Sequence, residues 1–164
     1  MADTIVNVTT PSDREVVVTR SFNAPRELVW DAHTKPELVR RWLLGPPGWT
    51  MPVCEIDLRV GGRYRYQLQG PNGEVMACGG VFREIAPPQR LVTAERFDED
   101  WTGGETINTI VLVERNGRTQ LTLSVLYVSK EARDAALATG MTVGLEAGYR
   151  ALDDVLAAMV AESD

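Results

Sequence analysis

Few residues in this 164-residue chain could support catalysis. His33 is the only histidine, which excludes a metal site built from several histidines. We expect it to be a surface or helix-end residue, because a general base would need a carboxylate and a substrate beside it. Cys54 and Cys78 have no histidine placed near them, so nucleophilic catalysis is not indicated. No phosphate-binding loop, Gly-x-Ser-x-Gly motif or metal-spaced cluster is present, so we expect no catalytic residue, no metal and no cofactor.

The two cysteines are too few for a disulfide framework. The strand pattern places Cys54 and Cys78 on the first and third strands of a meander, which are ~9–10 Å apart at ~4.8 Å per strand. A disulfide needs Cα atoms within about 7 Å of each other. We therefore expect two free, buried thiols.

Two polar residues interrupt apolar strands and are candidates for a binding site. Glu95 and Asn108 each lie in the middle of an expected strand. A polar side chain that points into a protein interior needs a partner, such as a ligand, a water molecule or Arg65. Glu95 with Arg65 or Tyr66 is the one pair that could form an acid–base centre. The sequence leaves open which face of its strand each residue takes.

The aromatic residues allow two interpretations. They could form an ordinary core, because large aromatic side chains dominate protein interiors, or they could line a ligand pocket. The residues expected to converge are Trp42, Trp49, Tyr64, Tyr66, Phe82, Phe97 and Trp101. With the polar pair and the helix residues described below, the candidate lining of a cavity is Trp42, Trp49, Tyr64, Tyr66, Phe82, Glu95, Phe97, Asn108, Met141, Leu145 and Tyr149.

Turn residues divide most of the chain into strands. Residues 15–22, with three consecutive valines, predict a first strand. Asn72-Gly73 and Asn116-Gly117 favour tight hairpins, and Gly79-Gly80 suggests a bulge. The other six predicted strands cover residues 53–58, 63–68, 74–85, 90–97, 105–115 and 118–128.

Two short helices are expected after the first strand. Pro25 suits the first turn of a helix that continues to His33. Thr34 and Glu37 match a capping box that would open a second helix, with Trp42 near its end.

The last stretch, residues 129–161, has the apolar spacing of one long helix with Ser129 as its cap. Met141, Leu145 and Tyr149 lie on the apolar face. Gly140, Gly144 and Gly148 form a stripe, and each glycine costs about 1 kcal/mol relative to alanine inside a helix. Either something packs closely against the stripe or the helix bends, and we expect a bend near Gly140.

Together these elements predict one α+β domain over residues 15–161, preceded by a flexible arm at 1–14. A strongly curved antiparallel sheet of seven strands would wrap around the long C-terminal helix. A curled sheet beneath a helix leaves room for a cavity, which is the functional site that the sequence suggests.

Composition excludes several classes of partner. The net charge of -6 argues against nucleic acid, which requires a basic surface. No apolar run reaches the ~18 residues of a membrane span. Residues 1–14 do not resemble a secretory signal, so we expect a cytoplasmic protein.

Several segments carry a resemblance to a known family: 24–30, 41–46, 57–64, Asn72-Gly73, Gly140-Met141, Gly144 and Tyr149. Together they resemble bacterial members of the START-like (helix-grip, SRPBCC) superfamily. The branch is the one homologous to the C-terminal domain of the activator of the heat-shock-protein ATPase. The similarity covers roughly residues 15–159, although Leu43-Leu44 stand where many relatives carry a second tryptophan.

Members of this superfamily bind hydrophobic molecules, carry lipids, cyclise polyketides or bind partner proteins, so the fold does not determine the activity. The leading interpretation is a non-enzymatic protein that binds a small hydrophobic or amphipathic molecule. The alternatives are an enzyme of the cyclase or hydrolase type, and a module that binds a chaperone and regulates its ATPase. We expect a monomer or a weak homodimer.

Overall fold

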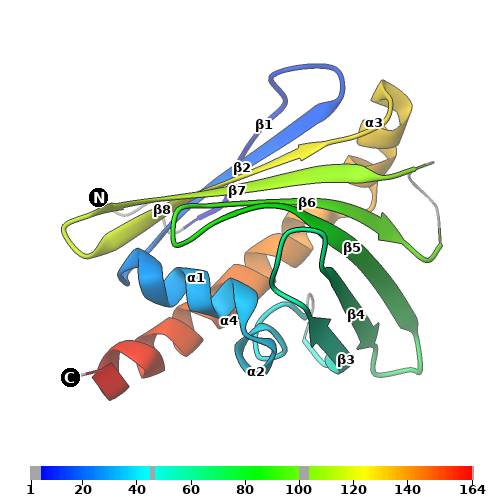
Figure 1. Cartoon of the computed structure of the whole chain (residues 1–164). Helices are drawn as coiled ribbons and strands as arrows, with labels where there is room; N and C mark the ends of the chain where they lie inside the picture. The colour runs from blue at the N-terminus through cyan, green and yellow to red at the C-terminus, as the bar shows by residue number, and fades with distance from the viewer. Residues whose placement is uncertain (1–4, 45–46, 100–103, 164) are drawn as a thin grey trace.

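The protein forms a single antiparallel sheet of eight strands that curls around its C-terminal helix (Figure 1). The computed structural model describes residues 5–44, 47–99 and 104–163. The strand order is β1-β2-β8-β7-β6-β5-β4-β3, and every neighbouring pair is antiparallel. The strands are β1 Asn7–Thr9, β2 Glu15–Phe22, β3 Thr50–Ile56, β4 Arg63–Gln69, β5 Val75–Ala86, β6 Arg90–Phe97, β7 Thr106–Arg115 and β8 Arg118–Leu126.

Helices occupy two places in the chain. The helices α1 (Arg26–Thr34) and α2 (Pro36–Val39) follow β2, and α3 (Lys130–Ala138) and α4 (Met141–Ser163) end the chain. The helix α4 runs diagonally across the concave face of the sheet, and α1 packs against it (Figure 1). This arrangement confirms the expected α+β fold with a curved sheet wrapped on a C-terminal helix, with one strand more than expected.

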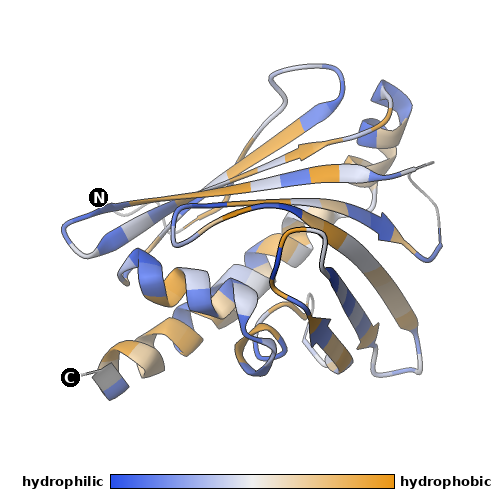
Figure 2. Ribbon diagram, in the orientation of Figure 1, coloured by the Kyte–Doolittle hydropathy of each residue, from blue (hydrophilic) through white to orange (hydrophobic). Residues whose placement is uncertain are grey.

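Alternation along the strands builds the core. In β2 the side chains of Val16, Val18 and Phe22 face inward and are completely buried. Figure 2 shows a continuous hydrophobic stretch along much of β7, whose sequence contains the run Ile-Val-Leu-Val. Leu152 and Leu156 of α4 complete the core from the other side and are almost inaccessible to solvent. The concave face is therefore the apolar one, as helix-covered sheets require.

The helical segment at the C-terminus is broken where we expected a bend. Ser129 caps α3 by accepting a hydrogen bond from the backbone N–H of Ala132 at 3.0 Å. Gly140 then takes φ +80°, which glycine adopts at little cost, and α4 starts at Met141. The glycine stripe has a second role at Gly148, where an added Cβ would lie 3.2 Å from the backbone oxygen of Trp42. That close contact is with the segment after α2, and not with the sheet.

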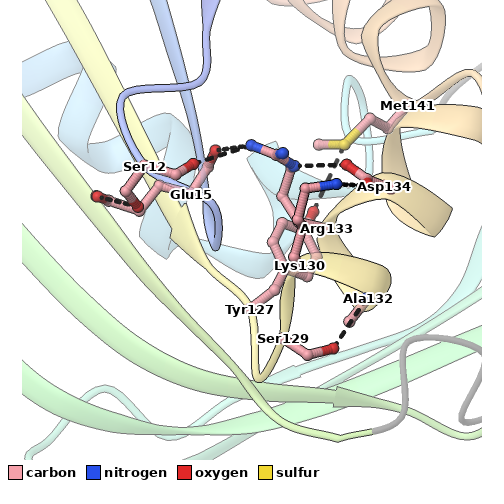
Figure 3. A network of polar contacts seen from close by, with 9 residues as sticks. All are labelled: Ser12, Glu15, Tyr127, Ser129, Lys130, Ala132, Arg133, Asp134 and Met141. Atoms are coloured by element: carbon pink, nitrogen blue, oxygen red, sulfur yellow. Dashed lines mark hydrogen bonds and ion pairs between the residues drawn. The ribbon is translucent and has the colours of Figure 1, made fainter.

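The helix α3 is tied to the start of β2 by a polar network (Figure 3). Arg133, which is buried, donates hydrogen bonds from Nη1 to the carbonyl oxygens of Ser12 at 2.9 Å and Glu15 at 3.4 Å. Its Nε donates to Asp134 at 2.9 Å. These contacts hold α3 at the end of the sheet, so that the break at Gly140 separates two helices that are each anchored.

A bidentate ion pair attaches α4 to the sheet. Arg20 of β2 points inward, and its guanidinium donates to the two carboxylate oxygens of Asp153 at 2.6 and 2.8 Å. The Arg20 side chain is 1% exposed and also lies over the ring of Phe22. This pair sets the position of the helix along the sheet.

Three local expectations were wrong. Part of the expected arm, Asn7–Thr9, is an edge strand paired with β2. Thr34 does not cap α2 but ends α1, where its hydroxyl donates to the carbonyl of Trp30 at 2.9 Å. The bulge in β5 lies between Phe82 and Glu84 and not at Gly79-Gly80, which are paired regularly on both sides.

Candidate functional site

The concave face of the sheet contains a buried polar cluster centred on Glu95. Its Oε2 accepts a hydrogen bond of 2.8 Å from the hydroxyl of Tyr64, and the Sγ of Cys78 lies 3.9 Å away. Its Oε1 accepts a hydrogen bond of 3.2 Å from Nδ2 of Asn108. Both polar residues that interrupt the apolar strands therefore point inward, and they contact each other.

Strand register explains how Tyr64 reaches Glu95. Gly80 of β5 is paired with Tyr64 on one side and with Glu95 on the other. Paired residues project from the same face of an antiparallel sheet. Gly80 has no side chain, and a Cβ there would lie 2.6 Å from the Tyr64 hydroxyl. The ring of Tyr64 therefore lies over β5 and bridges two strands that are not neighbours.

Arg65 is not the partner of Glu95. Its side chain lies on the other face of β4 and forms a bidentate ion pair with Asp98, with two contacts of 2.6 Å. The hydrogen bonds between them raise the pKa of Arg65 and lower the pKa of Asp98. The expected acid–base pairs of Glu95 with Arg65 or Tyr66 were wrong, since Tyr64 supplies the hydroxyl bonded to the carboxylate.

Burial dominates the electrostatics of the cluster. It raises the pKa of Glu95, and the hydrogen bonds from Tyr64, Asn108 and Cys78 oppose that rise. Burial, followed by the negative charge of Glu95, raises the pKa values of Tyr64, Tyr66 and Cys78. The same two causes raise the pKa of Tyr127 to about 12. The cluster thus holds its phenols and its thiol in their neutral forms.

Several concave-face residues around this cluster are only partly buried. Protein atoms surround the carboxyl group of Glu95, but the residue as a whole is only partly buried. The neighbouring concave-face positions on the central strands β7 and β8, Ile110 and Leu123, are also only partly buried. The other partly buried members of this group are Tyr66, Phe97, Asn108, Met141 and Leu145.

Some of the aromatic candidates lie away from the Glu95 carboxyl group. Trp42 and Tyr149 are buried in the core, stacked on each other with ring centroids 5.9 Å apart. Trp49 belongs to a smaller apolar cluster beside β3. Tyr64, which belongs to the cluster, packs with Tyr66 and with Phe82 on the sheet. The remaining aromatic, Trp101, lies outside the described residues.

The cysteines and the histidine that were considered for catalysis are part of the packing of the fold. Cys54 and Cys78 are both free and buried, as expected. His33 is in the last turn of α1, where Nδ1 donates to the carbonyl of Val29 at 2.8 Å and the ring packs on Trp42. Burial lowers its pKa to about 4. Over the described part of the chain, no group of three or more histidine, cysteine or acidic residues could hold a metal ion.

Two grooves on the surface lie away from the cluster. The larger has a volume of about 630 Å³ and lies between β1 and a face of α4 that does not carry Leu145 or Tyr149. It is lined by Val6, Val8, Pro47, Thr142, Val143, Glu146, Ala147 and Arg150. The smaller, of about 340 Å³, lies beside the start of α1, the start of β6 and the second half of β7. Neither groove includes a residue proposed from the sequence.

Several residues of the cluster could not be identified as such from the sequence. Gly80 was interpreted as a bulge, and Tyr127 and Cys78 were not placed in the site. The hydroxyl of Tyr127 donates to the sulfur of Met141 at 3.5 Å, which connects β8 to the start of α4. The alternation of β8 places Tyr127 in phase with Val125, and this phase is the signal that could have found it.

The curled antiparallel sheet and the C-terminal helix define a helix-grip protein of the START-like superfamily. The chain belongs to the family described as activator of Hsp90 ATPase homolog 1-like protein, whose model matches residues 23–157.

Similar structures support this assignment. A protein of Rhodobacter sphaeroides has 37% sequence identity and a TM-score of 0.88, and the match covers 94% of this chain and 99% of that one. A protein of Mycobacterium smegmatis has 28% identity and a TM-score of 0.81, with 92% and 96% covered. An AHSA1-like protein of Aeromonas hydrophila, at 19% identity with 85% and 93% covered, shares the fold with a TM-score of 0.67. No curated protein matches the chain. No helix in the described ranges is long and apolar enough to cross a membrane.

Proposed function

We propose that this protein binds a small hydrophobic or amphipathic molecule between the curved sheet and α4. The observation that carries the proposal is the accessible surface left on the concave face of the central strands, around a buried carboxyl group. In a fully packed interior, residues such as Ile110 and Leu123 would be enclosed on all sides. Their partial burial beneath the helix supports a site for an apolar ligand.

Displacement of a neutral apolar dye such as Nile red tests this function, together with native mass spectrometry of the purified protein. We expect saturable dye binding at one site per chain. A Leu123→Trp variant should fill the space and weaken binding by at least about tenfold. The matched control is Val143→Trp, because Val143 is 70% exposed in the larger surface groove.

The two tryptophan variants also locate the site. Loss of binding in Leu123→Trp with normal binding in Val143→Trp agrees with the proposal. The opposite result would place the ligand in the surface groove. Absence of saturable binding by the wild-type chain would contradict the function itself.

A second candidate function follows from the family description, which concerns activation of an Hsp90 ATPase. Under this alternative the chain binds the chaperone from the same cell and changes its rate of ATP hydrolysis. A steady-state ATPase assay with and without this protein tests it. A changed rate that persists in Leu123→Trp would show that the chaperone interaction does not depend on the interior site.

A further inference from the structure

Among the residues that the structure describes, the hydrogen-bond partners of the Glu95 carboxyl group are all neutral. They are the hydroxyl of Tyr64, the amide of Asn108 and the thiol of Cys78. The nearby cation Arg65 is on the other face of the sheet, paired with Asp98. A buried carboxylate that lacks a positive partner is unfavourable, because neutral donors replace only part of its hydration. The site therefore favours a ligand that brings a positive charge.

Asn108 adds a second acceptor beside this carboxylate. Its Nδ2 donates to Glu95, while its Oδ1 is buried and accepts no hydrogen bond from any residue in the described part of the chain. A buried acceptor without a donor costs about 1–3 kcal/mol. The carboxylate and the amide oxygen together offer acceptors to a group with several N–H donors, and an ammonium group has three.

Aromatic rings next to the carboxylate strengthen this preference. The ring centroid of Tyr64 is 5.0 Å from that of Tyr66 and 5.3 Å from that of Phe82. The face of an aromatic ring attracts a cation, and more strongly where water is excluded. The net charge of -6 on the chain also attracts cations and repels anions.

We propose that the ligand is an amphipathic primary amine, with its ammonium group bound by Glu95 and Asn108 and its apolar part along Ile110 and Leu123. This inference rests on the proposed function, because it names the chemical class of ligand for the same site. Fatty acids and other anionic amphiphiles are disfavoured, since their head group would meet the Glu95 carboxylate and the amide oxygen of Asn108.

Competition with Nile red distinguishes ligand classes that share one tail. The probes are octylamine, 1-octanol and octanoate at pH 7.5. We expect octylamine to bind at least about tenfold more tightly than 1-octanol, and octanoate to bind most weakly. Equal binding of the amine and the alcohol, or tighter binding of octanoate, would overturn the inference while the proposed function stands. Failure of Nile red itself to bind would overturn both.

The variant Glu95→Gln removes the charge and keeps an acceptor for Tyr64. It should weaken octylamine binding by at least about tenfold and change 1-octanol binding by less than about twofold. The matched control is Glu84→Gln, which makes the same change in net charge at an exposed residue paired with Arg90. An octylamine affinity that Glu95→Gln leaves unchanged would refute the assignment.

The pH dependence of the wild-type chain gives an independent test if Glu95→Gln does not fold. Burial raises the pKa of Glu95 above its ordinary value near 4.5. The other titratable groups that face it are Tyr64, Tyr66, Cys78 and Tyr127, whose pKa values are all raised, so they stay neutral below pH 8. Octylamine affinity should fall at least about fivefold from pH 8 to pH 4 as Glu95 is protonated, while 1-octanol affinity stays constant. A flat octylamine profile would overturn the inference.

Discussion

The hydroxyl of Tyr64 on β4 donates a 2.8 Å hydrogen bond to Glu95 on β6, across the strand that separates them. This contact depends on Gly80, the residue of β5 that is paired with both. Hydrogen bonds between side chains normally join neighbouring strands, because strands are about 4.8 Å apart. A glycine between two inward-facing residues lets one long side chain span twice that distance. The contact connects the polar cluster to the aromatic group.

Tyr64→Phe tests the importance of this contact. The variant removes one donor from a buried carboxyl group, so we expect a loss of about 1–3 kcal/mol in the free energy of unfolding at pH 7. It should also raise the pKa of Glu95 further, since that hydrogen bond favours the ionised form. Urea unfolding measures the first effect, and NMR titration of the Glu95 carboxyl carbon measures the second.

Tyr66→Phe is the control for this variant. It removes the same atom from the adjacent ring, and the hydroxyl bonded to Glu95 is that of Tyr64 and not of Tyr66. Equal effects of the two variants on the Glu95 pKa would show that the Tyr64 contact has no special role.

Gly80→Ala tests the close approach itself. The new methyl group would lie 2.5 Å from the carbonyl oxygen of Ala94 and 2.6 Å from the Tyr64 hydroxyl. Backbone and ring must both shift, and overpacking of this kind costs about 1–3 kcal/mol. Chemical denaturation gives the stability, and dye affinity shows whether the site also changes. A variant as stable as the wild type would mean that Tyr64 can leave β5 without loss.

Much of the fold could be predicted from periodicity and turn residues. The alternation of residues 63–68 and the Asn116-Gly117 turn identify β4 and the β7–β8 hairpin because both signals are local. The edge strand β1 could not be predicted, since Asn7–Thr9 is short and gains its conformation by pairing with β2. The capping box predicted at Thr34 was wrong for a related reason. The Thr34 hydroxyl donates a hydrogen bond to the carbonyl of Trp30 within α1, and a sequence motif for helix starts does not include that interaction.

The site could be predicted only in part. Glu95 and Asn108 stand out as polar residues in apolar strands, and the structure brings them together. Their partner Tyr64 could not be identified, because that contact depends on the register of β4, β5 and β6. A bulge at Phe82–Glu84 shifts the β5–β6 register, and the sequence indicated a bulge at Gly79-Gly80 instead. Trp42 is a candidate as an aromatic residue and Tyr149 as a residue of the apolar helix face, although their stack beside Gly148 is core packing.

Alanine substitutions at two glycines of the C-terminal helices should change the stability of the protein in opposite directions. A Cβ at Gly144 would meet no atom of the described residues within 4 Å, so Gly144→Ala should stabilise the protein by up to about 1 kcal/mol through helix propensity. Gly140→Ala should destabilise it by about 1 kcal/mol, because φ is +80° there. Thermal unfolding of both variants checks the signs. Stabilisation by Gly140→Ala would mean that α3 and α4 can join into one continuous helix.

The ion pair of Arg20 and Asp153 should respond unequally to the loss of either partner. Asp153→Ala leaves a guanidinium that is 1% exposed without its carboxylate, and we expect a loss of about 3–5 kcal/mol. Arg20→Met leaves a carboxylate that is 41% exposed and can be hydrated, so the loss should be smaller, about 1–2 kcal/mol. Urea unfolding of the two variants gives the comparison. Equal losses would show that burial of Arg20 does not control the energetics.

The lowered pKa of His33 predicts how the stability of the protein changes at acidic pH. Burial lowers its pKa from 6.5 to about 4, against the opposing effect of its hydrogen bond to Val29. Between these values the unfolded chain binds more protons at this residue than the folded one, so stability falls as the pH decreases from 6.5 to 4. Since His33 is the only histidine, its ring proton resonance in NMR reports this pKa without ambiguity. A midpoint near 6.5 would mean that the ring is solvated, and the pH dependence would then have to come from other groups. His33→Phe, which keeps a ring against Trp42, should flatten the stability profile over the same range.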